Sequence, residues 1–224
     1  MIVAGEEINS ICDQCAVEEQ RQKAQAAEEE RERLRNAVGF SNSCIPPRFA
    51  KMAYNDFKTN CDKAVAVKGR VGDFIKNFKD SMEKGTSFLF SGSTGTGKTH
   101  LACATANNII RKGYSAIYVS SLNYLSKVKA AWNVEAGTSE DEVIESYVKF
   151  DLLILDELGK GELNQKERGM IFRLIDRRSE ECKPTIGITK FSPDKLISLI
   201  DDDAVRRLKA GGGGVLLFDW PAYQ

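Results

Sequence analysis

The chain has 224 residues, of which 42% are hydrophobic and 29% are charged, so it is long enough for one folded domain and an appendage. The 32 Lys and Arg residues balance the 32 Asp and Glu residues, and a formal charge of zero excludes a generally basic, histone-like protein. No run approaches the ~18 apolar residues that a membrane span requires, and the N-terminus lacks the basic start and apolar stretch of a secretory signal. We expect no membrane partner and, because the six cysteines form no dense framework, a reducing, cytoplasmic setting.

The N-terminal segment 16–36 consists almost entirely of strong helix formers. It lacks the apolar a/d seam of a coiled coil, so we interpret it as a solvated single helix, with a helix that docks on a partner as the alternative. Gly39 and a later Pro-Pro pair end this region and mark a linker. The predicted organisation is a helical N-terminal extension with its linker over residues 1–45, followed by the main domain over residues 46–224.

Beyond the linker, predicted helices and strands alternate along the chain. The segment TSEDE at 138–142 looks like a capping box ahead of a helix over 143–147, and the apolar run 151–156 is typical of a strand that is buried on both faces. The other predicted helices cover 62–83, 98–111, 122–132, 164–181 and 193–200, and the other predicted strands cover 88–90, 116–119, 185–189 and 215–218. This alternation predicts an α/β fold in which helices flank a parallel sheet.

The segment from Gly92 to Thr99 matches the phosphate-binding loop pattern G-x-x-x-x-G-K-[ST] (Walker A), with a strand before it and a helix after it. The glycines allow backbone N–H groups to turn inward around phosphate oxygens, and the helix N-terminus adds partial positive charge. Lys98 is expected to reach the β- and γ-phosphates of ATP, and the Thr99 hydroxyl to ligate Mg²⁺. The predicted nucleotide-binding residues are Gly92, Ser93, Thr94, Gly95, Thr96, Gly97, Lys98, Thr99 and His100.

A second motif (Walker B) ends the apolar strand 151–156 in Asp156-Glu157. Taken alone, an apolar strand that ends in two acids is often only a strand that leaves the core. Downstream of a phosphate-binding loop, it indicates a phosphate-loop NTPase. Asp156 is then expected to hold Mg²⁺ through water and Glu157 to orient or deprotonate the attacking water, a pairing that favours ATP hydrolysis over kinase chemistry.

Four segments resemble the DnaC-type helicase loaders, which are AAA+ ATPases close to the IstB transposition helpers and related to the DnaA initiator. They are SGSTGTGKTHLA, FDLLILDELG, LIDRRSEECKPTIGIT and RRLKAGGGGVLLFDWPAY, and the resemblance covers about residues 44–224. It implies an AAA+ P-loop fold that binds ATP and single-stranded DNA, forms a homo-oligomer in the ATP state, and has a DnaB-like replicative helicase as its partner. It also implies that Arg207 is an arginine finger acting on ATP held by a neighbouring subunit, and that Thr189 and Lys190 occupy the sensor position.

The resemblance further implies that the helical segment 122–132 contacts single-stranded DNA. From the residues alone, Lys127 and Lys129 could supply phosphate contacts and Trp132 a stacking platform for a base. The alternative is that Trp132 belongs to the core and that both lysines belong to a solvated face.

Lys190 departs from the family, which has Asn at that position, and Gln224 stands where a further Arg usually follows the terminal Tyr. At the end of a parallel strand, Lys190 is expected to project into the crevice beside Asp156 and Glu157. We expect it to pair with Glu157 and make that carboxylate a poorer base, rather than to stabilise charge on the transferred phosphoryl group. The chain would then bind ATP well, hydrolyse it slowly, and use ATP mainly as an assembly switch.

Cys12 and Cys15 look like half of a zinc site, and some loader relatives have a four-cysteine site there. Zinc is not expected, because a structural site needs about four ligands and the nearest other thiols, Cys44 and Cys61, are isolated. The predicted function is an ATP-hydrolysing replication protein that loads a replicative helicase onto single-stranded DNA. Two alternatives stay open: an IstB-like helper of a transposase, and a nucleotide-gated adaptor with little hydrolysis.

Overall fold

The computed structural model describes residues 18, 21–22, 25, 38–132 and 137–223. The predicted N-terminal helix lies mostly outside these residues, and Cys12, Cys15 and Gln224 lie wholly outside them. In the part that is described, no helix is both long and apolar enough to cross a bilayer.

A parallel five-stranded sheet, in the order β2-β3-β4-β1-β5, forms the centre of the described structure. Its strands are β1 (Phe88–Gly92), β2 (Ala116–Ser120), β3 (Leu152–Asp156), β4 (Thr185–Thr189) and β5 (Gly214–Phe218). Every residue of β3 and β4 is buried, which the continuous apolar sequence of β3 predicted. The strand order places the carboxyl ends of β1, β3 and β4 side by side, and this edge is where parallel sheets bind ligands.

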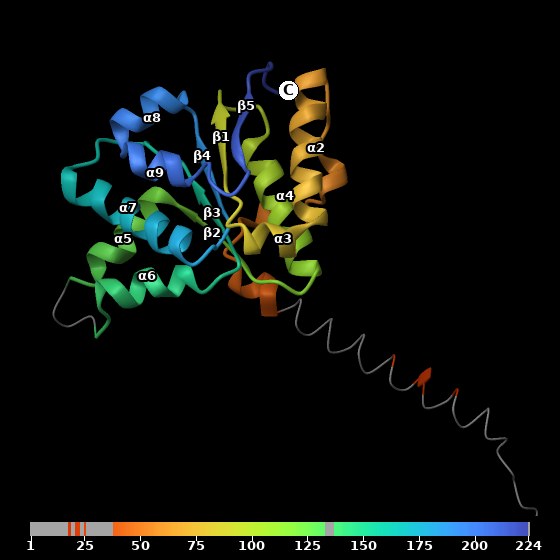
Figure 1. Cartoon of the computed structure of the whole chain (residues 1–224), viewed down its shortest axis with the longest axis horizontal. Helices are drawn as coiled ribbons and strands as arrows, with labels where there is room; N and C mark the ends of the chain where they lie inside the picture. The colour runs from red at the N-terminus through yellow and green to blue at the C-terminus, as the bar shows by residue number, and fades with distance from the viewer. Residues whose placement is uncertain (1–17, 19–20, 23–24, 26–37, 133–136, 224) are drawn as a thin grey trace, which may run out of the picture.

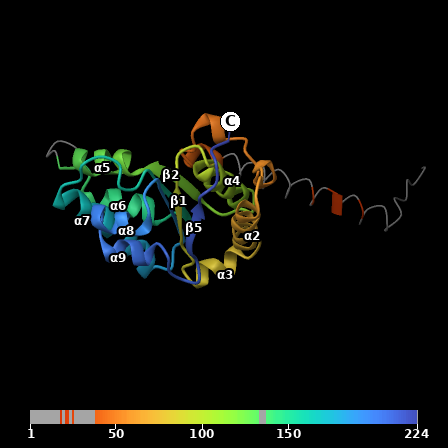
Figure 2. The ribbon, with the colours of Figure 1, turned by 90° about the horizontal axis from the view of Figure 1, so that it is seen from above.

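Helices cover both faces of the sheet (Figures 1 and 2). One layer contains α2 (Asp62–Lys76), α3 (Phe78–Glu83) and α4 (Lys98–Arg111), and the opposite layer contains α5 (Ser121–Ala130), α6 (Glu140–Val148), α7 (Gln165–Glu180), α8 (Pro193–Leu199) and α9 (Asp202–Arg207). Each layer packs its own buried apolar cluster against the sheet. The fold is therefore the predicted α/β class, and two 3₁₀ helices, η1 (Pro47–Phe49) and η2 (Tyr54–Asp56), precede α2 at the start of the main domain.

The predicted helix over 62–83 is two helices, and α9 was not predicted at all. The break falls at Asn77, whose backbone leaves the helical region (φ −105°, ψ 37°). This break lets Phe78 pack edge-on against Phe74 and Tyr114, with ring centroids 5.3 and 4.9 Å away. The helix α9 spans only six residues, too few for its apolar periodicity to be recognised in the sequence.

Arg178, near the end of α7, is fully buried and joins the end of α6 to the start of β4. Its guanidinium donates to four backbone carbonyls and to the Thr185 hydroxyl, at 2.7–3.1 Å. Three of those carbonyls belong to the end of α6 and the residues just after it, which are acceptors that a helix C-terminus leaves unpaired. Burial lowers the pKa of Arg178 to about 9, so the side chain remains charged at neutral pH.

Candidate functional site

The phosphate-binding loop connects β1 to α4 and is supported from behind by the C-terminal segment. Gly95 and Gly97 adopt positive φ angles of 85° and 90°, and a Cβ at Gly97 would come within 2.8 Å of the Phe57 ring. The Trp220 indole donates to the Thr96 carbonyl at 3.1 Å, and the backbone N–H of Tyr223 donates to the Gly95 carbonyl at 3.0 Å. Glycine is needed where the backbone is left-handed and neighbouring atoms leave no room for a Cβ. Together these contacts fix the conformation of the loop, which faces a cavity.

Lys98 is folded into this loop. Its Nζ donates to the carbonyls of Gly92 and Ser93 at 2.6 and 2.5 Å. Burial lowers the pKa of the Lys98 ammonium, and the nearby Asp156 carboxylate opposes that shift. The ammonium is thus held at the loop by carbonyl dipoles, which phosphate oxygens can replace as stronger, charged acceptors.

Thr99 and Asp156 meet as their motifs predicted, since the Thr99 hydroxyl donates to Asp156 Oδ2 at 2.9 Å. Tyr118, on β2, donates its hydroxyl to the same oxygen at 2.9 Å, and the backbone N–H of Glu157 donates to Oδ1 at 2.6 Å. Burial and the Asp156 carboxylate raise the pKa of Tyr118, so it stays a donor. Tyr118 was not predicted from the sequence, where its only signal is a hydroxyl-bearing aromatic residue within an apolar strand.

These residues fit a magnesium nucleotide. Hydroxyl and carboxylate oxygens are the hard ligands that Mg²⁺ prefers, and proteins commonly bind it through one or two carboxylates together with substrate phosphates. Among the described residues, no group of three or more His, Cys, Asp or Glu side chains could hold a metal ion alone. The pair Thr99–Asp156 beside the phosphate-binding loop is the arrangement that shares such an ion with a nucleotide.

Glu157 pairs with Lys160, and the predicted pair with Lys190 is wrong in this structure. Lys160 Nζ lies 2.6 Å from Glu157 Oε1, whereas Lys190 Nζ lies 5.1 Å from the centroid of the Phe191 ring. Lys160 follows Glu157 by three residues in one loop, so only a short piece of chain must be ordered to bring them together, whereas Lys190 follows another strand, β4. Glu157 itself has a left-handed backbone (φ 59°), and its carbonyl accepts from Ser121 at 2.9 Å.

The other sensor residue, Thr189, ties β4 to the loop that follows β3. Its hydroxyl is buried and donates to the Leu158 carbonyl at 2.8 Å. His100, on α4, packs its ring edge-on against Phe57 with centroids 6.0 Å apart. Burial lowers the pKa of His100, and its Nε2 is buried without a hydrogen-bond partner among the described residues.

One cavity of about 700 Å³ brings most of these residues together. The predicted residues that line it are Thr94, Gly95, Gly97, Lys98, Thr99, His100, Asp156, Glu157, Thr189 and Lys190. Lining residues that the sequence analysis did not single out are Arg48, Phe49, Tyr118, Leu158, Lys160, Ile188, Phe191 and Tyr223. Gly92, Ser93 and Thr96 shape the loop through their backbone and hydrogen bonds instead.

Arg207 is not among the residues that line this cavity. It ends α9, and its Nε donates to Asp176 Oδ1 on α7 at 2.7 Å. Its guanidinium also lies over the Phe172 ring, 5.4 Å from the centroid. The Arg207 side chain is therefore held against α7, outside the cavity of its own chain.

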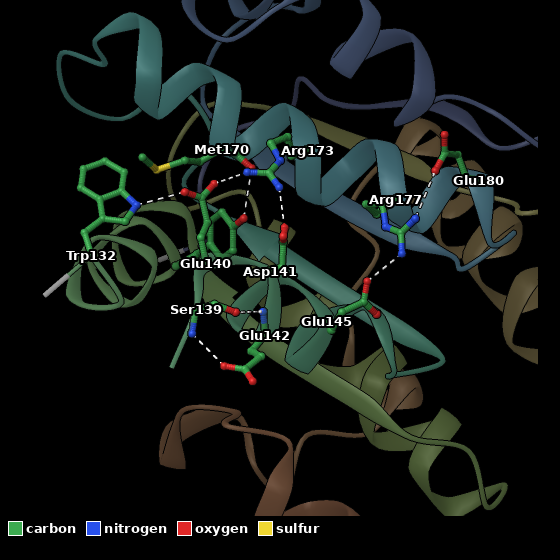
Figure 3. Close-up of polar contacts among 11 residues, drawn as sticks. Trp132, Ser139, Glu140, Asp141, Glu142, Glu145, Met170, Arg173, Arg177 and Glu180 are labelled. Atoms are coloured by element: carbon green, nitrogen blue, oxygen red, sulfur yellow. Dashed lines mark hydrogen bonds and ion pairs between the residues drawn. The ribbon is translucent and has the colours of Figure 1, made fainter. Parts of the chain in front are cut away.

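The predicted DNA-binding side chains are engaged with neighbouring helices. Lys129 forms an ion pair with Glu167, and Lys127 Nζ lies 5.4 Å from the centroid of the Tyr147 ring. Trp132 is 49% exposed, which contradicts the alternative that it belongs to the core. Its indole donates to Glu140 at 3.0 Å (Figure 3). Contact of these residues with DNA stays a prediction.

Comparison with known proteins agrees with this geometry. The family described as IstB-like ATP binding protein matches residues 24–204. The replicative helicase loader DnaC of Escherichia coli (strain K12) is 26% identical over 202 residues, which cover 90% of this chain and 81% of that protein. The replicative helicase loader DnaC of Buchnera aphidicola subsp. Baizongia pistaciae is 30% identical over 152 residues, which cover 68% of this chain and 61% of that protein.

Two solved structures show the fold. The crystal structure of the DnaC helicase loader superposes with a TM-score of 0.68 at 23% identity, over 77% of this chain and 99% of that chain. AMPPCP-bound DnaA from Aquifex aeolicus superposes with a TM-score of 0.64 at 22% identity, over 78% of this chain and 51% of that chain. The fold is thus that of the AAA+ P-loop domains. With the family match over residues 24–204, the chain belongs to the IstB-like ATP binding proteins and is a relative of the DnaC-type helicase loaders.

Proposed function

We propose that the chain binds ATP with Mg²⁺, hydrolyses it, and loads a replicative helicase onto single-stranded DNA. The observation that carries the proposal is that Lys98, Thr99, Asp156 and Glu157 line one cavity, in a chain similar over 90% of its length to a replicative helicase loader. The contact of Thr99 with Asp156 supports the nucleotide site independently of the sequence match.

Each side chain has a distinct part in the proposed reaction. Lys98 exchanges the loop carbonyls for oxygens of the β- and γ-phosphates. Thr99 and Asp156 hold a magnesium ion, which when bound neutralises charge on those phosphates. Glu157 orients the attacking water and takes its proton, and this requires its carboxylate to leave Lys160.

The proposal includes a homo-oligomer in the ATP state, because Arg207 is held outside the cavity of its own chain. Its guanidinium then acts on ATP in a neighbouring subunit, where arginine fingers stabilise the charge of the transition state. Alone, each subunit would hydrolyse ATP slowly. Assembly completes the site, so hydrolysis depends on contact between subunits or on the DNA that organises them.

We also propose that residues 1–45 form the extension that binds the helicase and that residues 46–224 form the ATPase domain. The linker is attached to that domain, since the Ser43 carbonyl accepts from the Tyr118 N–H at 2.8 Å along the edge of β2. Phe40 and Ile45 pack against the core on the α4 side of the sheet. The described end of this segment is therefore fixed to the domain, with the Phe40 ring beside Arg111 at the C-terminal end of α4.

A second candidate function, delivery of a transposase to target DNA, is favoured by the match to the IstB-like family over residues 24–204. The ATPase site would be the same in both, so the partner distinguishes them.

The test is reconstitution with the purified replicative helicase of the host, circular single-stranded DNA and ATP, followed by isolation of helicase on the DNA. Helicase should be recovered on the circle with the wild-type chain and not with Lys98→Ala. Binding to the transposase of a neighbouring insertion element, with no binding to the helicase, would contradict the loader assignment. ATP turnover that stays at background with helicase and DNA present would contradict the proposed hydrolysis.

A further inference from the structure

Arg207 is held by two residues of α7 that lie one helical turn apart. Its Nε donates to Asp176 Oδ1 at 2.7 Å, and its Nη2 forms an ion pair with the same oxygen. Phe172 precedes Asp176 by four residues, which puts both on one face of the helix, and its ring lies under the guanidinium. One edge of the guanidinium and one of its faces are therefore both in contact with α7.

The Arg207–Asp176 ion pair is partly shielded from water, whereas the side chain of the preceding residue, Arg206, is not. The side chains of Arg207 and Asp176 are 27% and 24% exposed. Arg206, by contrast, pairs with Asp203 inside α9 at 70% exposure. Charge-assisted hydrogen bonds are stronger where water is excluded, so the contacts of Arg207 hold its side chain more firmly than the exposed pair holds Arg206.

The contacts leave the other edge of Arg207 open. Asp176 takes the Nε and Nη2 edge, and within the described residues Nη1 has no hydrogen-bond acceptor. An arginine side chain without contacts samples many rotamers. The entropy that is lost when these rotamers are restricted during the reaction lowers the reaction rate. Guanidinium groups that are fixed before reaction avoid that loss.

We propose that Asp176 is a positioning residue that holds Arg207 with its Nη1 edge directed to the phosphates of ATP bound by a neighbouring subunit. The inference rests on the proposed action of Arg207 between subunits. The opposite role is that Asp176 masks Arg207 and must release it. The two roles predict opposite changes in rate when the carboxylate becomes an amide.

The experiment mixes two variants of the full chain so that only one kind of interface is active. The acceptor subunit carries Arg207→Ala and keeps its own ATP site, while the donor subunit carries Glu157→Gln and keeps its arginine. Turnover in the mixture then reports arginine delivered from donor to acceptor. Asp176→Asn is added to the donor, and kcat and KM for ATP are measured with single-stranded DNA present.

We expect Asp176→Asn in the donor to lower kcat by about 10–100-fold, the loss that follows a misplacement near 1 Å, without changing KM. Asp176→Glu in the donor should restore most of the rate, because it keeps the carboxylate. The matched control is Glu145→Gln in the donor, which breaks the exposed ion pair of Arg177 on the same helix (Figure 3) and should leave kcat unchanged.

Four results would overturn the inference. A higher kcat with Asp176→Asn would show masking, and an equal loss when the substitution is moved to the acceptor would show a merely structural role. An unchanged kcat after Asp176→Asn, when the parent mixture is more active than its separate components, would reject the positioning role while the action of Arg207 between subunits stands. A parent mixture no more active than its separate components would reject that action and this inference with it.

Discussion

Replacing Lys160 by Ala removes the cation that holds the Glu157 carboxylate in the nucleotide-free chain. The two side chains meet at 2.6 Å, and Glu157 must leave this contact before it can take a proton from water. The substitution should therefore raise the rate of ATP hydrolysis. It should leave ATP affinity nearly unchanged, because the proposed nucleotide ligands Lys98 and Thr99 are not altered.

The expected size of the increase in kcat follows from the solvent exposure of the two side chains. The Lys160 and Glu157 side chains are 53% and 40% exposed, and ion pairs at such positions contribute roughly 0.2–1 kcal/mol. A change of about 1.4 kcal/mol in the barrier alters a rate tenfold. Loss of the pair should therefore raise kcat by no more than about fivefold.

Steady-state ATP turnover, measured with single-stranded DNA present, tests this prediction. Lys190→Asn replaces another lysine of the cavity without breaking an ion pair of Glu157, so it should not reproduce the increase. A fall in kcat for Lys160→Ala would show that Lys160 stabilises charge on the phosphoryl group. A rise far above fivefold would show that the pair is much stronger than its exposure allows.

The arrangement of local elements could be predicted because it depends on short-range patterns. The helix α4 begins and ends where its phosphate-loop start and its glycine stop predicted, at Lys98 and Arg111. The position of β1 between β4 and β5 could not be predicted, because strand order depends on contacts between residues far apart in the chain. The break at Asn77 depends in the same way on the Phe78 ring, which packs against Tyr114.

Contacts in the candidate site could be predicted where a motif fixes the spacing of the residues. They could not be predicted where several side chains can pair with the same partner. Motif chemistry placed Thr99 beside Asp156, and the structure brings them to 2.9 Å. Tyr118 was missed because its role depends on the side-by-side pairing of β2 and β3. The pair of Lys190 with Glu157 was a reasonable electrostatic expectation, but Lys160 is nearer along the chain and takes that place.

Three further predictions concern nucleotide binding, hydrolysis and stability. Lys98→Ala should weaken ATP binding at least about tenfold in a fluorescent-nucleotide titration, since a hydrogen bond from a charged group contributes about 1.5–3 kcal/mol; unchanged affinity would reject the phosphate-loop assignment. Glu157→Gln should bind ATP normally and lose turnover, because only the proton transfer needs the carboxylate; normal turnover would remove Glu157 from the mechanism. Arg178→Met should lower the free energy of unfolding by about 3–5 kcal/mol in urea titrations, because several buried acceptors lose a partner and each unsatisfied group costs about 1–3 kcal/mol. Its five acceptor oxygens lose their shared donor when the fully buried guanidinium is removed, and methionine fills the space without replacing any of those bonds. Arg177→Met is the matched control one residue earlier, where the half-exposed side chain makes only surface ion pairs and the loss should stay within about 1 kcal/mol; equal losses for the two variants would show that the buried hydrogen bonds of Arg178 do not stabilise the fold.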